Sequence, residues 1–276
     1  MSESLVGYEI SDNVALLRLN DPATLNACSD EMGELLIERL TQAQREARAI
    51  VLTGVGRGFS SGANLAASAV DKPAAERDAG ARLEGLFNPL MTLIRGLAVP
   101  FVTAVNGAAA GAGCCIGLSG DLVVAAESAY FLQAFTRIGL IPDAGSAYLL
   151  AKAAGRVRAM EAMLLAEKIG ARQAMEWGLV NRVVPDGTAL DAAMALATRL
   201  AAGPTYALGL ARRLAWFALE EKLVEQLALE RRLQRLAGRN PDFEEGMAAF
   251  RDKRAPHFSG ASTSTDDGLP SATERE

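Results

Sequence analysis

Residues 96–120 carry no charged side chain, and this run limits the folds open to the chain more than any other part of the sequence. A membrane-spanning helix needs about 20 strongly apolar residues. This run instead consists mostly of alanine and glycine, and Pro100 and Asn106 interrupt it. We therefore expect no membrane span. We predict a buried strand over 100–105, a turn at Asn106 and Gly107, and a tightly packed helix that begins near Gly111.

Short apolar strands alternate with helices through the first half of the chain, a pattern typical of an α/β fold. Strands are predicted over 14–19, 50–53 and 122–125, and helices over 83–97 and over 29–40, where Ser29 is a suitable N-cap. The second half is helical, with glycine or proline between its segments: 145–167, 171–177, 188–201, 204–218, 222–237 and 241–252. No convincing internal repeat is visible. We predict an α/β core over 1–200, a helical region over 201–260 and a disordered polar tail over 261–276.

Charge and composition exclude several classes of function. The net charge of −5 argues against a nucleic-acid partner. Three cysteines, at 28, 114 and 115, and no recognisable signal peptide predict a cytoplasmic location. The single histidine, His257, lies near the polar C-terminal end. It is poorly placed for a Ser-His-Asp or Cys-His mechanism, and one histidine without a CxxC pair gives no zinc site.

Two glycine-rich segments follow predicted strands, at 50–65 and at 106–115. Such loops leave backbone N–H groups free to bind an anion or a carbonyl oxygen. Their spacing matches neither GxGxxG nor a P-loop. From the residues alone, a tight turn explains the first segment equally well, and close helix packing explains the second. Cys115 is interpreted as a small core residue rather than a nucleophile, because its neighbours are apolar.

Two further segments carry charge that chemistry could use. Asp143 lies between Pro142 and Ala144, just before a predicted helix, so capping of that helix is the favoured interpretation of its carboxylate in isolation. The segment 250–258 combines three cations with two aromatic residues, which could hold a nucleotide. A solvated helix end with favourable C-terminal charges explains it more simply.

Taken together and in order, six segments resemble the crotonase superfamily, the enoyl-CoA hydratases and isomerases, from about Val6 to Gly260. The matching segments are 21–27, 50–65, 100–113, 139–145, 177–185 and 250–258. The resemblance implies a crotonase (ClpP-like) α/β fold, with a core of repeated β-β-α units and a helical C-terminal trimerisation region. It also implies an acyl-CoA substrate, a homotrimer or a hexamer built as a dimer of trimers, and no separate cofactor, since CoA is part of the substrate.

The resemblance also implies a set of site residues. The backbone amides of Ala63 and Ala112 would form an oxyanion hole for the thioester carbonyl. Phe250 and Lys253 would reach the CoA of a neighbouring subunit. The other residues implied to bind CoA are Ala23, Thr24, Leu25, Asn64 and Leu65. The acyl pocket would include Phe135, Leu140, Ile141 and Cys115, and its far wall would come from 66–90. Members that hydrate a double bond carry two glutamates, and Cys115 and Phe135 occupy those positions here.

The remaining carboxylate, Asp143, then becomes the candidate acid/base. The segment 133–143 is most similar to the subgroup of ring 1,2-epoxyphenylacetyl-CoA isomerases and Δ3,Δ2-enoyl-CoA isomerases, in which an aspartate at this position is catalytic. The implied activity is an acyl-CoA isomerase that shifts a double bond or rearranges a ring through an enolate, in fatty acid metabolism or phenylacetate degradation. The alternatives are an enoyl-CoA hydratase and a non-catalytic acyl-CoA-binding protein. Apolar neighbours are expected to raise the pKa of Asp143.

Overall fold

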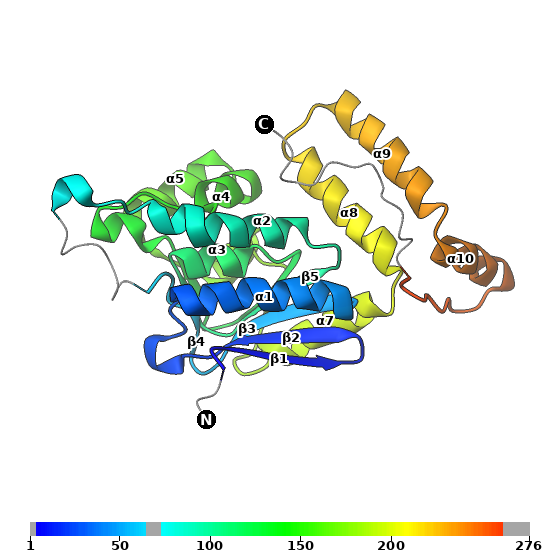
Figure 1. Cartoon of the computed structure of the whole chain (residues 1–276), viewed down its shortest axis with the longest axis horizontal. Helices are drawn as coiled ribbons and strands as arrows, with labels where there is room; N and C mark the ends of the chain where they lie inside the picture. The colour runs from blue at the N-terminus through cyan, green and yellow to red at the C-terminus, as the bar shows by residue number, and fades with distance from the viewer. Residues whose placement is uncertain (1–3, 65–72, 262–276) are drawn as a thin grey trace.

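The computed structural model describes residues 4–64 and 73–261. Its largest element is a six-stranded sheet in the order β1-β2-β3-β5-β7-β10, in which only β1 runs antiparallel to its neighbour (Figure 1). The strands are β1 (Val6–Ser11), β2 (Val14–Leu19), β3 (Ala49–Gly54), β5 (Phe101–Val105), β7 (Leu122–Ala126) and β10 (Arg182–Val184). The strands predicted over 14–19, 50–53, 100–105 and 122–125 are therefore confirmed. The central strands are continuous apolar runs because helices cover both faces of the sheet.

A second, smaller sheet has the order β4-β6-β8-β9. Its strands are β4 (Gly58–Ser60), β6 (Ala108–Ala110), β8 (Tyr130–Leu132) and β9 (Lys168–Gly170). Each of β3, β5 and β7 in the large sheet is followed by a strand of the small sheet and then by a helix, which is α2 (Asn88–Gly96), α3 (Ala112–Leu118) or α4 (Ser146–Ala154). The repeated β-β-α core is therefore confirmed. Because β4, β6 and β8 are parallel neighbours, the three segments that follow them meet at one edge.

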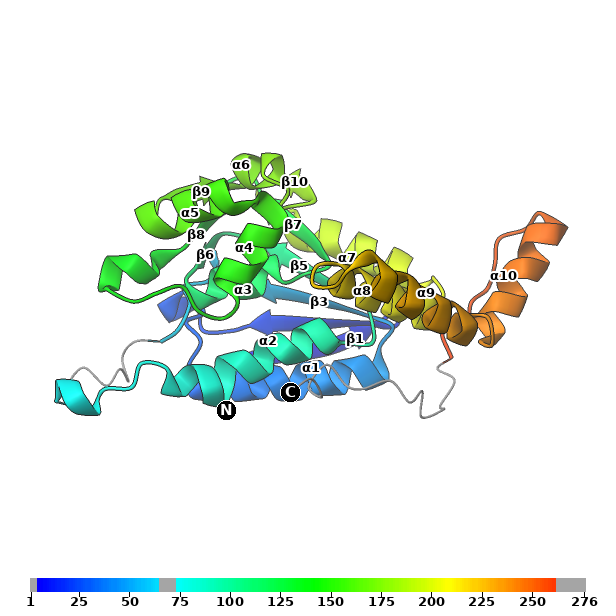
Figure 2. The same cartoon turned by 90° about the horizontal axis from the view of Figure 1, so that it is seen from above.

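The helices α1 (Asp30–Glu46) and α2 lie on one side of the large sheet, and α7 (Ala189–Ala201) lies on the other (Figure 2). The hydroxyl of Ser29 accepts a hydrogen bond from the N–H of Met32 at 3.1 Å, as expected of an N-cap. The buried face of α1 includes Met32, Leu36 and Leu40. Each such side chain contributes roughly 1.5–3 kcal/mol by its burial.

Several predicted boundaries need correction. The predicted helix 83–97 begins with a π-helical turn, η5 (Leu83–Phe87), before α2. The predicted helix 145–167 is two helices, α4 and α5 (Arg156–Leu165), because Gly155 takes a φ of +82° between them. The turn at Asn106 leads into β6 before α3 begins. The predicted helix 29–40 ends too early, because α1 continues to Glu46. The remaining helices agree closely with the predicted segments, and they include α6 (Ala171–Glu176).

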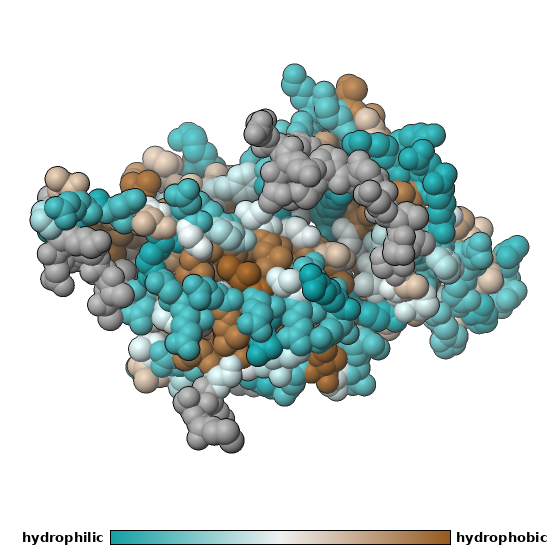
Figure 3. Space-filling model, viewed as in Figure 1, coloured by the Kyte–Doolittle hydropathy of each residue, from teal (hydrophilic) through white to brown (hydrophobic). Residues whose placement is uncertain are grey.

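The last three helices extend away from the α/β body (Figures 1 and 2). They are α8 (Thr205–Ala218), α9 (Leu223–Ala237) and α10 (Pro241–Asp252). The buried Arg212 of α8 attaches this arm to the body through an ion pair with Asp121 at 2.5 Å. Several large apolar side chains of α9 and α10 are exposed: Leu223, Val224, Leu227, Phe243, Met247 and Phe250. Figure 3 shows apolar atoms on the surface at the start of α9.

Two parts of the sequence-based division of the chain stay predictions. The predicted disordered tail over 261–276 lies outside the described residues apart from Ala261, and the boundary at residue 200 stays a prediction. Over 4–64 and 73–261, no helix combines the length and the apolar character that crossing a bilayer requires.

Candidate active site

The segment after β4 presents the amide of Ala63. The N–H of Cys28 donates to the carbonyl of Gly62 at 2.7 Å, and the N–H of Asn64 donates to the carbonyl of Cys28 at 2.9 Å. In a trans peptide the C=O and the following N–H point in opposite directions. The Ala63 N–H therefore points away from Cys28. Among the described residues, this N–H has no hydrogen-bond acceptor.

The segment after β6 presents the amide of Ala112. Ala112 is the first residue of α3, where a backbone N–H has no intrahelical partner. Gly62 has a φ of +97°, and a Cβ atom there would lie 2.7 Å from the Ala110 oxygen and 3.3 Å from the Ala112 nitrogen. The segments after β4 and β6 are thus in contact at Gly62, where any other residue would strain the backbone. Ala63 and Ala112 thus each carry a backbone N–H without an acceptor among the described residues, and both pack in one apolar cluster. N–H groups of this kind can stabilise a developing oxyanion.

Asn26 holds the predicted CoA-binding turn against the glycine-rich loop. Its side chain is fully buried, and it donates to the carbonyls of Val55 at 3.0 Å and Gly58 at 2.9 Å. The Ser61 hydroxyl donates to the Thr24 carbonyl at 2.8 Å. Hydrogen bonds thus tie Thr24 and Leu25 to Ser61, two residues before Ala63. Ala23 belongs to the same turn, Pro22–Thr24, and Asn64 directly follows Ala63. Leu65 lies outside the described residues, and so do residues 66–72, the first part of the predicted far wall of the acyl pocket.

A small apolar cluster surrounds the two amides. Its buried residues come from four separate segments of the chain, and Ala63 packs against them. They are Cys28, Leu86, Phe87, Ala112, Cys115 and Ala144. The Phe135 side chain is also buried and lies beside Gly111. Burial raises the pKa of the Cys115 thiol well above its usual value, and the thiol lies 2.7 Å from the Ser146 hydroxyl. Cys115 is therefore a core residue here, as the sequence predicted.

Asp143 borders this cluster and follows β8 along the chain. Its backbone carbonyl accepts from the Ser146 hydroxyl at 2.5 Å and from the Ser146 N–H at 2.9 Å. The interpretation of Asp143 as a helix cap is wrong, because α4 begins after Gly145 and has no side-chain cap. Within the described residues, the buried Oδ1 atom of Asp143 has no hydrogen-bond partner. A carboxyl oxygen that is buried and unpaired is a candidate for chemistry.

Burial raises the pKa of Asp143 to about 6, and the positive charge of Arg82 partly opposes this rise. The carboxyl can therefore exchange a proton near neutral pH. The raised pKa has the predicted direction, but its surroundings differ from the prediction. Ile141 is 81% exposed and Leu140 is 39% exposed, so in this chain they do not enclose the carboxyl. The apolar contact comes instead from the cluster that contains Cys115 and Ala144.

Phe250 and Lys253 lie far from Asp143 within one chain. Both are on the projecting α10 arm, and Phe250 is 80% exposed. Sequence reasoning also missed two residues that contact the site, Arg82 and Ser146. Arg82 lies in a segment without a motif, and its contacts come from residues 18 and 54 positions away. Ser146 directly follows the matched segment 139–145, so its closeness to Asp143 in the sequence was available as a signal.

The raised pKa of Asp143 predicts a stability change in the variant Asp143→Asn. A folded-state pKa above the unfolded value makes ionisation costly, so the wild type loses stability as the pH rises through about 6. We expect the variant to be more stable by roughly 1–2 kcal/mol at about pH 8, a value reduced for the partial exposure of the carboxyl. Urea unfolding at fixed protein concentration measures it. If Asp143→Asn were no more stable than the wild type at about pH 8, the burial argument would be contradicted.

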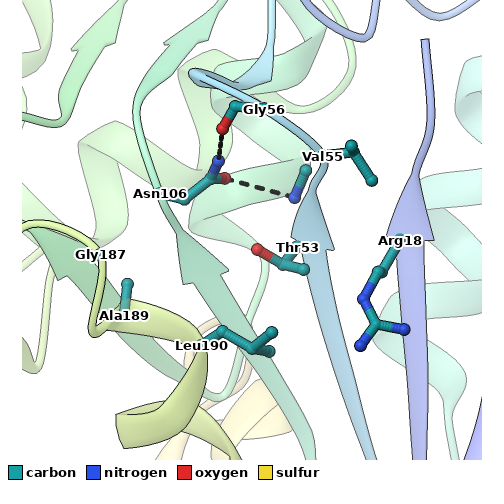
Figure 4. Close-up of a pocket in the computed structure, with 9 residues that line it drawn as sticks. Arg18, Thr53, Val55, Gly56, Asn106, Gly187, Ala189 and Leu190 are labelled. Carbon is teal, nitrogen blue, oxygen red and sulfur yellow. Dashed lines mark hydrogen bonds between the residues drawn. The ribbon is translucent and has the colours of Figure 1, made fainter. Parts of the chain in front are cut away.

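A separate cavity of about 470 Å³ lies at the ends of β2, β3 and β5, against the start of α7 (Figure 4). The Asn106 side chain accepts from the Gly54 N–H at 3.3 Å and donates to the Gly56 carbonyl at 2.9 Å. Arg18, on its other wall, pairs with Glu9 at 2.8 Å. The cavity shares no lining residue with the Asp143 cluster. Its polar groups hold the loop 54–58 in place.

Within the described part of the chain, no three His, Cys, Asp or Glu side chains come together as metal ligands would. The groups available for chemistry are two backbone amides and one carboxyl, brought together by the three adjacent strands of the small sheet. A pair of amides aimed at one oxygen stabilises negative charge, and a carboxyl with a pKa near neutrality moves protons.

The chain is similar to known proteins along most of its length. Residues 9–261 match the enoyl-CoA hydratase/isomerase family. The chain is 46% identical to the 1,2-epoxyphenylacetyl-CoA isomerase of Escherichia coli K12, over 94% of this chain and 100% of that protein. It is 44% identical to a Rhodobacter capsulatus protein named a probable enoyl-CoA hydratase, with the same coverage. The crystal structure of an enoyl-CoA hydratase from Polaromonas superposes with a TM-score of 0.83 at 34% identity, covering 92% of this chain and 99% of that one.

Proposed function

Because this chain belongs to the enoyl-CoA hydratase/isomerase family, we propose that it is an acyl-CoA isomerase that shifts a double bond or rearranges a ring through an enolate. The observation that carries this proposal is the single carboxyl of Asp143, which is unpaired at Oδ1 and has a pKa of about 6. It borders the cluster that contains both free amides. One base and one oxyanion site are sufficient for isomerisation.

The proposed mechanism uses only groups of this chain. The Ala63 and Ala112 N–H groups polarise the thioester carbonyl, which makes a hydrogen at C2 more acidic. Asp143 takes that proton, and the two N–H groups stabilise the enolate oxygen. Return of the proton to C4 moves the double bond, and no water molecule takes part. The buried Phe135 and Cys115 keep this region apolar, which favours a neutral carboxyl waiting to return its proton.

The second candidate is an enoyl-CoA hydratase, which the Rhodobacter relative's name favours. Syn addition of water needs one group to activate water and another to deliver a proton. At the positions where hydratases of this superfamily carry their glutamates, this chain has Cys115 and Phe135. The Phe135 ring can do neither task, and burial keeps the Cys115 thiol protonated by raising its pKa. Isomerisation is therefore the better supported reaction.

CoA would bind along Ala23, Thr24, Leu25, Asn64 and Leu65, with Phe250 and Lys253 supplied by a neighbouring subunit. The proposed assembly is a homotrimer or a dimer of trimers. Exposed apolar side chains on α9 and α10 support it, since such surfaces usually mark protein–protein contacts. Light scattering at micromolar concentration checks the assembly, and a monomer would contradict it. A cytoplasmic location remains an expectation from the free cysteines.

A panel of enoyl-CoA esters tests the proposed function. Each 3-enoyl-CoA is incubated with the protein, and the appearance of the conjugated 2-enoyl-CoA is followed by its absorbance. In parallel, each 2-enoyl-CoA is assayed for loss of that absorbance through hydration. We expect migration of the double bond with little hydration. Efficient hydration of crotonyl-CoA without any migration would support the hydratase instead.

The pH dependence of the reaction follows from the pKa of Asp143. As a base it must be ionised in the free enzyme, so kcat/KM should fall as the pH drops below about 6. The measurement is the rate of double-bond migration between about pH 5 and pH 8, where an unperturbed aspartate would already be fully ionised. A rate that stays constant down to about pH 5 would show that the proton acceptor has no raised pKa, which would contradict the buried Asp143 carboxyl as the base.

A further inference from the structure

Arg82 joins three parts of the chain beside the oxyanion site. It directly precedes η5, and its side chain is 30% exposed. Its guanidinium donates to the carbonyl of Asn64 at 3.0 Å and to the carbonyl of Cys28 at 3.1 Å. It also pairs with the Asp30 carboxylate at 2.6 Å and lies 5.5 Å from the centre of the Phe87 ring. Its position is therefore fixed from four directions.

The two carbonyls that Arg82 contacts flank the Ala63 amide. Cys28 and Ala63 form an isolated parallel bridge, in which Cys28 donates to Gly62 and accepts from Asn64. The Cys28 carbonyl therefore accepts from both Asn64 and Arg82, while the Asn64 carbonyl accepts from Arg82 on the other side of the bridge. One guanidinium thus binds both sides of this bridge, next to the peptide group that carries the Ala63 N–H.

We propose that Arg82 is a positioning residue: by clamping the carbonyls of Cys28 and Asn64, it fixes the direction of the Ala63 N–H that polarises the thioester. This inference rests on the proposed function of the two amides. Its physical reason is the planar guanidinium, which has five N–H donors in a rigid fork and binds two carbonyls and a carboxylate at once. A lysine would keep the charge but could not hold both carbonyls in one fixed geometry.

Arg82 has a second effect, through its charge, on the carboxyl of Asp143. Among the described residues, two groups near this carboxyl can carry charge: the Arg82 cation, which lowers the pKa of Asp143, and the Cys115 thiol, which burial keeps neutral. The Asp30 carboxylate is already paired with Arg82. Loss of the Arg82 charge should therefore raise the pKa of Asp143 and move the acid limb of kcat/KM to higher pH. Loss of the fork alone should leave that limb in place.

Two variants separate the fork from the charge, and a third serves as a matched control. Arg82→Lys keeps the charge, and Arg82→Met removes both the charge and the donors. Arg39→Met is the control, because Arg39 is 29% exposed, pairs with Glu38 and lies 5.7 Å from the Tyr8 ring, yet contacts no carbonyl near Ala63. Arg39 and Arg82 are thus alike in exposure, ion pairing and aromatic contact. They differ in that only Arg82 of the two binds the carbonyls beside Ala63.

We expect Arg82→Lys to lower kcat by about 10-fold or more with KM and the acid limb nearly unchanged, since a mispositioned donor weakens only the transition state. Arg82→Met should lower kcat further, toward the roughly 10²–10³-fold loss of a missing oxyanion donor, and should move the acid limb upward. Arg39→Met should do neither. Wild-type kcat in Arg82→Met, or a change confined to KM, would overturn the proposal.

A readout without turnover keeps this inference separate from the proposed function. The carbonyl stretch of bound, ¹³C-labelled crotonyl-CoA is measured by difference infrared spectroscopy in the wild type and in both Arg82 variants. We expect a shift to lower wavenumber in the wild type and a smaller shift in each variant. An equal shift in all three proteins would overturn the role of Arg82 and leave the oxyanion site intact. No shift in the wild type would instead contradict the proposed function of the two amides.

Discussion

Asp143→Asn is expected to lower the rate of double-bond migration by about 10²–10⁴-fold, the usual contribution of a general acid/base group. The carboxyl both accepts and returns the proton in the proposed mechanism, so the loss should reach the upper part of that range. Asparagine has nearly the same shape. The backbone carbonyl of Asp143, not its side chain, makes the contacts to Ser146, so the loop should keep its conformation. The assay is double-bond migration with a saturating 3-enoyl-CoA, alongside the unfolding midpoint.

Two control variants accompany this prediction. Cys115→Ser and His257→Ala should keep most of the activity. The Cys115 thiol is buried with a raised pKa, and His257 lies beyond α10 on the exposed arm. If Asp143→Asn kept most of its turnover while either control lost it, Asp143 would be the wrong base.

Ala112→Pro is expected to lower kcat by about 10²–10³-fold, the usual result of removing one oxyanion donor. Proline lacks the N–H but is well tolerated at the first position of a helix, which Ala112 occupies in α3. Because the Ala112 N–H has no acceptor among the described residues, the substitution breaks no hydrogen bond within that part of the fold. The defect should therefore be chemical rather than structural, and circular dichroism checks that the helices remain.

The matched control is Ala112→Gly, which keeps the N–H and removes only a methyl group. It should retain kcat within a few-fold. If the glycine variant lost as much activity as the proline variant, the methyl group rather than the N–H would matter. An unimpaired proline variant would show that Ala112 is not an oxyanion donor.

The longer elements of the fold could be predicted from the sequence because their patterns are local. Continuous apolar runs indicated β2, β3, β5 and β7, and the glycines and prolines marked most helix ends. The short strands β4, β6, β8, β9 and β10 were missed because three residues show no periodicity. The six-residue edge strand β1 was missed as well. The short strands of the small sheet are also the reason that no internal repeat was visible, since the β-β-α unit recurs in space without recurring in sequence.

The site was predicted in part, and for the same physical reason. The glycine-rich loops indicated free amides, but only the pairing of β4 with β6 brings Gly62 against Ala112. For Asp143, local reasoning favoured a helix cap, and the resemblance to a family reversed that interpretation. The contacts of Arg82 join residues far apart in the sequence, so no local pattern predicted them. The exposure of Ile141 likewise depends on where the folded chain places its loop, which the local sequence does not determine.

Hydrogen exchange at C2 tests the proposed enolate most directly, because it reports proton removal whether or not a product is released. A 3-enoyl-CoA with two deuterons at C2 is incubated with the protein in water, and deuterium NMR follows the loss of label from C2, whether the label goes to water or to C4. The account predicts rapid loss with the wild type, loss slowed by about 10²-fold or more with Asp143→Asn, and no dependence on Cys115. Retention of both deuterons at C2 during turnover by the wild type would contradict removal of a C2 proton by Asp143, whereas label that has moved to C4 would support it.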